Sequence, residues 1–112
     1  MAKVEIVESL DKEIEKKFKG DPREIIKLLR SLEENPNKGK IVGQVGGLVI
    51  KELKYRPFRF YFIIEGNKLK VFSEEELIDL LLLFVRMSDK KNQQKIIDEI
   101  KEILSKFGKE GF

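Results

Sequence analysis

A change in hydrophobic period near residue 40 most constrains how this chain can fold. Before that point apolar residues recur every three or four positions, whereas residues 41–64 form short alternating or β-branched runs. The first pattern predicts amphipathic helices and the second predicts strands. We therefore expect an α+β fold in which helices pack on a sheet.

Two helices are predicted before the change, after a short first strand at residues 4–7. Leu10, Ile14 and Phe18 define the first helix, which ends at Gly20. Asp21 and Pro22 are typical of the start of a second helix. Its apolar positions lie on one face: Ile25, Leu28, Leu29 and Leu32. The pair predicts a helical hairpin whose apolar stripes pack on the sheet.

Short turns separate the strands expected after residue 40. These strands are predicted at residues 41–45, 48–54, 58–64, 69–72 and 82–87, with a turn or two of helix at 74–81. The turns are too short for crossover connections, so an antiparallel sheet is expected. A last helix, capped by Ser88 or Asp89, carries an apolar stripe from Ile96 to Phe107 and ends at Gly108. Residues 1–112 are predicted to form a single domain.

The amino-acid composition limits the reactions and ligands that are possible for this chain. The chain has 112 residues, 41% hydrophobic and 38% charged, without Cys or His. These absences exclude thiol, imidazole and zinc-finger chemistry, so we expect no metal or cofactor, and any reaction must use Lys, Arg, Tyr or carboxylates. The longest apolar run, residues 80–85, is too short to span a bilayer, which predicts a cytoplasmic protein. Abundant Lys, Glu and Ile fit a thermophilic source.

A predicted hairpin brings basic residues together. Residues 51–70 contain six basic and two acidic side chains. If residues 55–58 form the connection, Lys54 lies directly opposite Arg59. Alternation then places Glu52, Tyr61 and Lys70 on the same face, and Leu53 and Phe60 on the core face. Paired cations repel unless a polyanion neutralises them, which favours a nucleic acid partner. The alternative is an ordinary half-exposed sheet with a charged outer face.

Two segments resemble a known family. Residues 47–54 and 58–68 resemble the core motif of the RelE/ParE toxin superfamily, and residues 84–91 resemble a stretch of its HigB-like, phage-related branch. The resemblance implies an antiparallel sheet packed against an N-terminal helical hairpin and a C-terminal helix. It also implies a ribosome-dependent mRNA endoribonuclease that a cognate antitoxin holds inactive, as a monomer or in a toxin–antitoxin complex.

The resemblance also implies the site residues. Lys54 would act as base or proton relay, Arg59 would hold the phosphate, and Arg86 would contact the phosphate or leaving group. Such roles suit ribose 2′-hydroxyl attack on the adjacent phosphate, because a lysine crowded by cations loses its proton more readily and arginine clamps phosphate with two hydrogen bonds. The expected RNA contacts are Lys51, Arg56, Tyr61, Lys70, Lys90 and Lys91.

The tail and one insertion depart from the family pattern. Residues 107–112 offer Phe where many of these ribonucleases have Tyr or His, and residues 73–79 add acidic side chains. A second hypothesis is therefore a non-catalytic binding protein on the same scaffold, such as a gyrase inhibitor or an orphan regulatory module. A purely structural or interaction domain is a third.

Overall fold

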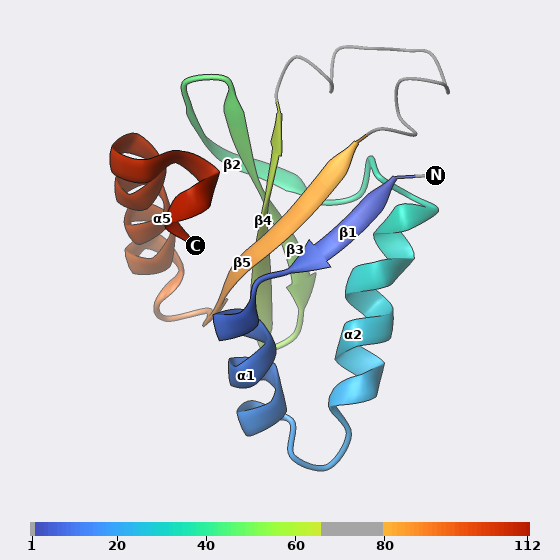
Figure 1. Ribbon diagram of the computed structural model, residues 1–112. Coiled ribbons are helices and arrows are strands. Elements are labelled where there is room, and N and C mark those ends of the chain that lie inside the picture. The colour runs from blue at the N-terminus through green and yellow to red at the C-terminus, as the bar shows by residue number, and fades with distance from the viewer. Residues whose placement is uncertain (1, 66–79) are drawn as a thin grey trace.

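The computed structural model describes residues 2–65 and 80–112, which form an α+β fold (Figure 1). Five strands in this part of the chain build one sheet: β1 (Lys3–Ile6), β2 (Lys40–Val45), β3 (Leu48–Tyr55), β4 (Phe58–Glu65) and β5 (Leu81–Asp89). The helices are α1 (Glu8–Lys17), α2 (Pro22–Arg30) and α5 (Gln93–Phe107), with short 3-10 turns at Ser31–Glu33 and Gly108–Gly111.

The sheet is mixed, with the strand order β1-β5-β4-β3-β2. The pairs β2–β3 and β3–β4 are antiparallel, as predicted. The pair β4–β5 is also antiparallel, although the sequence did not predict that these two strands are neighbours, and β1 runs parallel to β5. The prediction of an antiparallel sheet is therefore wrong for β1. Short turns fix the direction of neighbouring strands in a hairpin, whereas β1 and β5 lie far apart in the chain and no turn constrains them.

Apolar residues fill both faces of the sheet. Alternation along β3 and β4 sends Leu53, Phe60 and Phe62 to one face, and Ile50 and Ile63 to the other. Helices α1 and α2 cover the first face with their apolar stripes, while α5 covers the second, so the sheet lies between two helical layers. The helix residues buried in these cores are Leu10, Ile14, Ile25 and Leu29 on one side and Ile97, Ile100 and Leu104 on the other.

Helices α1 and α2 both occur where they were predicted. The Asp21 carboxylate accepts a hydrogen bond from the Arg23 backbone N–H at 3.2 Å, which caps α2. Figure 1 shows the two helices well apart on the sheet, joined only at their lower ends. They do not pack along each other as the predicted hairpin would. None of the helices in the described residues has the length and apolar character needed to cross a membrane.

The second half of the chain differs from the prediction in two places. The strand expected at 69–72 and most of the helix expected at 74–81 lie outside the described residues, and Leu81 already belongs to β5. Neither Ser88 nor Asp89 caps α5, because β5 continues to Asp89 and the N-cap residue is Asn92. Asp89 instead accepts hydrogen bonds from the Asn92 backbone N–H and side chain at 2.8 and 2.9 Å.

Candidate anion-binding pocket

The β3–β4 hairpin has the register that the sequence predicts. Tyr55 pairs with Phe58 around the Arg56-Pro57 turn, and Lys54 pairs with Arg59. The turn lies at the lower end of the sheet in Figure 1, close to the connection from β5 to α5. Cross-strand partners project to the same face of a sheet, so the two cations emerge together on the face that α5 covers further along.

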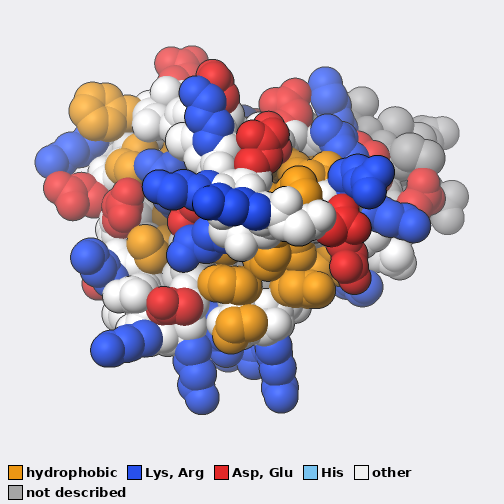
Figure 2. Space-filling view, turned by 90° about the horizontal axis from the view of Figure 1, so that it is seen from below, with side chains coloured by type: hydrophobic (Ala, Val, Ile, Leu, Met, Phe, Trp, Pro, Cys, Tyr) orange, Lys and Arg blue, Asp and Glu red, His pale blue; other side chains and the backbone are white. Residues whose placement is uncertain are grey.

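A pocket of about 360 Å³ lies beside this pair. Its lining consists of Lys54, Arg56, Pro57, Arg59 and, from the β5–α5 connection, Lys90. Four of these five residues are cationic, and none of the described carboxylates lines the pocket. Figure 2 looks onto this end of the molecule, where many Lys and Arg side chains project. We refer to these five residues as the basic pocket.

Arg59 is the most deeply placed cation of the basic pocket. Only 6% of the residue is exposed, and its Nη1 donates a hydrogen bond to the Pro57 carbonyl oxygen at 3.0 Å. Its Nε is buried and has no hydrogen-bond partner among the described residues. A buried donor without an acceptor costs about 1–3 kcal/mol, so the position of Arg59 in the basic pocket lowers the stability of the fold.

A buried polar cluster lies two residue pairs further along the same strands. Glu52 pairs with Tyr61, and the Tyr61 hydroxyl lies 2.8 Å from Ser88 Oγ. Gln93, the first residue of α5, donates to the Glu52 carboxylate at 3.0 Å. Burial raises the pKa of the Tyr61 phenol, and the nearby Glu52 carboxylate raises it further. This cluster ties α5 to the sheet next to the basic pocket.

The turn that carries Lys90 is held by the neighbouring Asp89. Its two hydrogen bonds from Asn92 keep the pKa of the Asp89 carboxyl below its ordinary value, and the backbone bond is the main cause. The fixed turn sets the direction from which Lys90 reaches the basic pocket. Lys91 follows in the same connection and is exposed, but it does not line the pocket.

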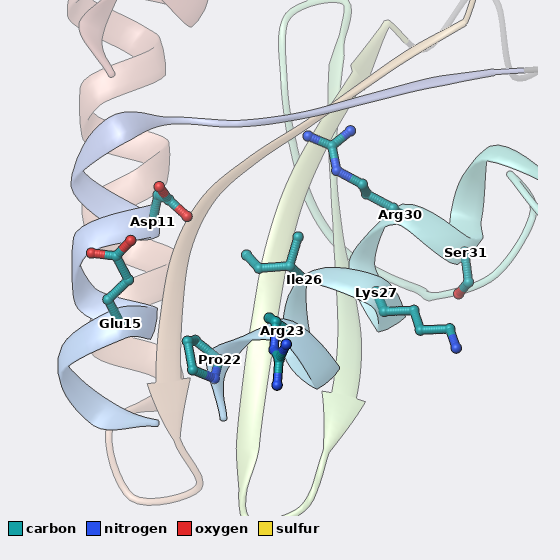
Figure 3. Close-up of a pocket in the computed structure, with 8 residues that line it drawn as sticks. All are labelled: Asp11, Glu15, Pro22, Arg23, Ile26, Lys27, Arg30 and Ser31. Atoms are coloured by element: carbon teal, nitrogen blue, oxygen red, sulfur yellow. The ribbon is translucent and has the colours of Figure 1, made fainter. Parts of the chain in front are cut away.

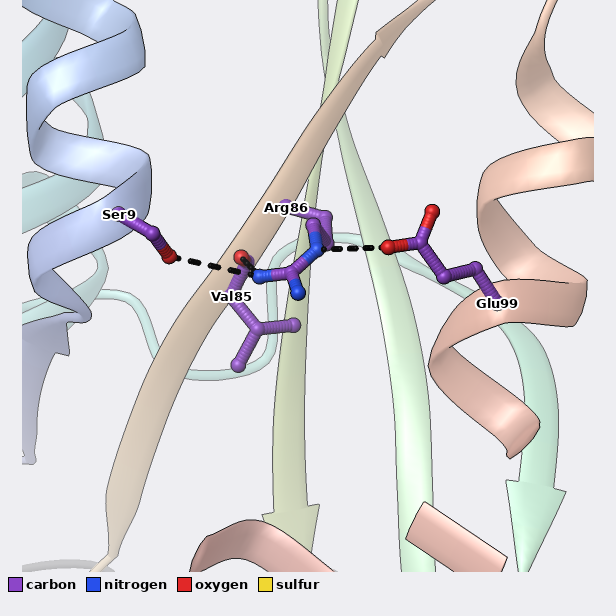
Figure 4. Close-up of polar contacts among 4 residues, drawn as sticks. All are labelled: Ser9, Val85, Arg86 and Glu99. Atoms are coloured by element: carbon purple, nitrogen blue, oxygen red, sulfur yellow. Dashed lines mark hydrogen bonds and ion pairs between the residues drawn. The ribbon is translucent and has the colours of Figure 1, made fainter. Parts of the chain in front are cut away.

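Arg86 does not join the basic pocket. It pairs with Tyr61 across β4 and β5, and its side chain turns toward α5 (Figure 4). Its Nε lies 3.3 Å from the Glu99 carboxylate, its Nη1 donates to the Val85 carbonyl oxygen at 2.8 Å and to the Ser9 hydroxyl at 3.5 Å, and its guanidinium lies 5.0 Å from the Phe112 ring centroid. The predicted grouping of Arg86 with Lys54 and Arg59 is wrong, because these partners hold it elsewhere.

Two predicted RNA contacts are buried. Tyr61 is fully enclosed beneath α5. Lys51 lies on the opposite face of β3 from Lys54, because residues three apart in a strand point to opposite faces. Its ammonium donates to the Asn37 carbonyl oxygen at 3.2 Å and lies 5.9 Å from the Phe62 ring centroid. The remaining predicted contact, Lys70, falls outside the described residues.

Lys51 makes a testable contribution to the pH dependence of stability. Burial lowers its pKa from the ordinary value of 10.5, so the folded protein releases this proton at a lower pH than the unfolded chain. Between the lowered pKa and 10.5 the unfolded state binds more protons, and stability rises with pH. We expect the difference in unfolding free energy between wild type and Lys51→Met, measured by urea denaturation, to shift in favour of wild type as the pH rises toward 10.5. A pH-independent difference would contradict this.

Sequence reasoning missed the supporting residues of the pocket. Alternation placed Glu52 on the correct face, but nothing in the sequence marked Gln93 as its partner. Comparisons with protein-family models, with curated proteins and with solved structures find no match for this chain. The fold and the pocket therefore define the protein on their own as a small α+β protein with a cationic pocket at one end of its sheet.

Proposed function

We propose that the protein binds RNA through the basic pocket and cleaves it as a toxin-type endoribonuclease with a RelE/ParE-like arrangement. One observation carries this proposal: four cations surround one pocket, and the most buried of them, Arg59, has a donor for which the described residues supply no partner. A phosphodiester offers two non-bridging oxygens and a negative charge, which match this arrangement. The resemblance of residues 47–54 and 58–68 to the family motif supports the same substrate.

The residues of the basic pocket can be assigned roles in cleavage. Arg59, with Arg56 beside it, holds the non-bridging oxygens and stabilises the charge that develops on them. The ribose 2′-oxygen forms a bond to phosphorus while the bond to the 5′-oxygen breaks. Lys54 relays the 2′-hydroxyl proton to water, and Lys90 gives a proton to the leaving oxygen. Arg86 has no direct role in this scheme, because Glu99 holds it away from the basic pocket.

The proposed substrate is mRNA on the ribosome, and the proposed place of action is the cytoplasm. The proposed partner is a cognate antitoxin protein that covers the basic pocket with acidic side chains or displaces α5. The dense cation lining supports an acidic inhibitor for the same electrostatic reason that it supports RNA.

The ion pair of Arg86 with Glu99 favours a second candidate function. A scaffold with only part of the predicted catalytic group would bind its partner without cutting it. This alternative is a non-catalytic binding protein, for example an orphan regulatory module or a gyrase inhibitor.

Cleavage of translating mRNA separates the two functions. Purified wild-type protein and Lys54→Ala are added to a translation reaction, and cuts in the ribosome-bound message are mapped by primer extension. We expect wild type to cut and Lys54→Ala to cut at least about 100-fold more slowly, which is the range for loss of a general base. RNA binding that weakens with salt but produces no cuts would favour the non-catalytic protein. Absence of both would contradict the RNA proposal.

A further inference from the structure

A second cavity lies on the other side of the sheet from α5. It is a groove of about 640 Å³ between α1 and α2, the two helices that stand apart on the sheet (Figure 3). The basic pocket opens on the face that α5 covers, so the groove is separate from it. An inference about the groove does not depend on the RNA proposal.

The two walls of the groove carry opposite charges. Asp11 and Glu15 lie one turn apart on α1, whereas Arg23, Lys27 and Arg30 line the α2 side. Figure 3 shows the two carboxylates on the α1 side and the Ile26 side chain between the helices. An apolar centre therefore lies between an acidic edge and a basic edge.

The opposite charges do not pair across the groove. Within residues 2–65 and 80–112, the side chains of Asp11, Glu15 and Lys27 form no hydrogen bond or ion pair. Neither arginine pairs with Asp11 or Glu15: Arg23 contacts Asp21 at 3.3 Å, and Arg30 donates to the Val4 carbonyl oxygen of β1 at 3.4 Å. Both edges are thus available to a ligand that carries both signs of charge.

This pattern restricts the ligand. The Asp11 and Glu15 carboxylates repel a nucleic acid, and a small ion of one sign pairs with one wall only. An amphipathic helix meets all three parts of the groove, since it can carry an apolar stripe flanked by a basic edge and an acidic edge. Basic residues four apart on such a helix match the spacing of Asp11 and Glu15.

We propose that the α1–α2 groove docks an amphipathic helix of a partner protein, with the basic edge of that helix against α1 and its acidic edge against α2. The docked helix packs its apolar stripe on Ile26 and fills the space that separates α1 from α2. Charge order across the groove sets the direction in which the helix lies.

A designed peptide tests this proposal by charge exchange. The probe is a fluorescein-labelled helical peptide with a leucine stripe, lysines four apart on one edge and glutamates on the other, and binding to the full chain is followed by fluorescence anisotropy. We expect saturable binding by wild type and about tenfold weaker binding by D11K/E15K. A second peptide with its lysines and glutamates exchanged should prefer D11K/E15K.

A matched control lies on α5, where Asp98 and Glu102 are also four apart and exposed. D98K/E102K should bind the first peptide as wild type does, and circular dichroism should show that both double variants fold. The proposal is overturned if wild type fails to bind, or if the two double variants weaken binding equally. It is also overturned if wild type is a dimer that D11K/E15K converts to a monomer, because the groove then belongs to a second copy.

Discussion

Arg59→Met is expected to lower RNA cleavage by about 100- to 1000-fold, the range seen when one donor to a developing oxyanion is removed. Arg59 is the buried cation of the basic pocket, and its Nε is the donor for which the described residues supply no acceptor. Methionine keeps the aliphatic volume of the side chain but provides neither charge nor N–H. Single-turnover cleavage of a ribosome-bound message measures the loss, and thermal unfolding shows whether the variant folds.

Two further variants isolate the cause of the loss. Arg59→Lys keeps the charge but not the planar fork, so its rate should lie between those of wild type and Arg59→Met. Arg23→Met removes an exposed arginine that lines the cavity between α1 and α2 and not the basic pocket, and it should cleave at the wild-type rate. If Arg23→Met loses as much activity as Arg59→Met, the loss reflects net charge, and the assignment of Arg59 to the phosphate is wrong.

Phe62→Ala should lower the free energy of unfolding by about 3–5 kcal/mol, the usual cost of emptying a buried aromatic site. Phe62 is fully buried at the centre of the sheet, and its ring centroid lies 4.8 Å from that of Phe84. The backbone at Gly39 packs against the same ring, since a Cβ there would lie 3.0 Å from Phe62 Cζ. Rigid neighbours on both sides limit collapse of the cavity. Urea denaturation followed by circular dichroism measures the change.

Phe107 provides the matched control. It is 66% exposed on α5, so Phe107→Ala removes the same ring without emptying a core and should change the free energy of unfolding by less than about 0.5 kcal/mol. A loss below about 1 kcal/mol for Phe62→Ala would mean that the ring is not enclosed as described. The described packing of α1 and α2 on that face of the sheet would then need revision.

Local patterns in the sequence predicted the hairpin that forms the basic pocket. The short Arg56-Pro57 turn and the alternation of residues around it fix the register, and a shift by one residue would move Phe60 to the opposite face of the sheet. For this reason the facing pair of Lys54 and Arg59 could be placed correctly without coordinates. The positions of α1, α2 and α5 followed in the same way from their apolar stripes.

Long-range contacts were beyond the reach of such patterns. The contact of Arg86 with Glu99 joins β5 to α5, and no spacing of residues in the sequence predicts it. The parallel direction of β1 depends on how the first helices cross the sheet. Lys51 is a different case: its burial opposite Lys54 follows from strand alternation, and it was wrongly grouped with the other cations because it is close to them in sequence.

The resonance of the Arg59 Nε–H group tests the central claim most directly. ¹⁵N-labelled protein is titrated with inorganic phosphate and then with a short single-stranded oligoribonucleotide, and Arg59→Lys assigns the signal. The account predicts a saturable shift of the Arg59 signal, with a smaller one for Arg56 and none for Arg23. An Arg59 signal that stays in place while RNA binds, or equal shifts at all arginines, would contradict it.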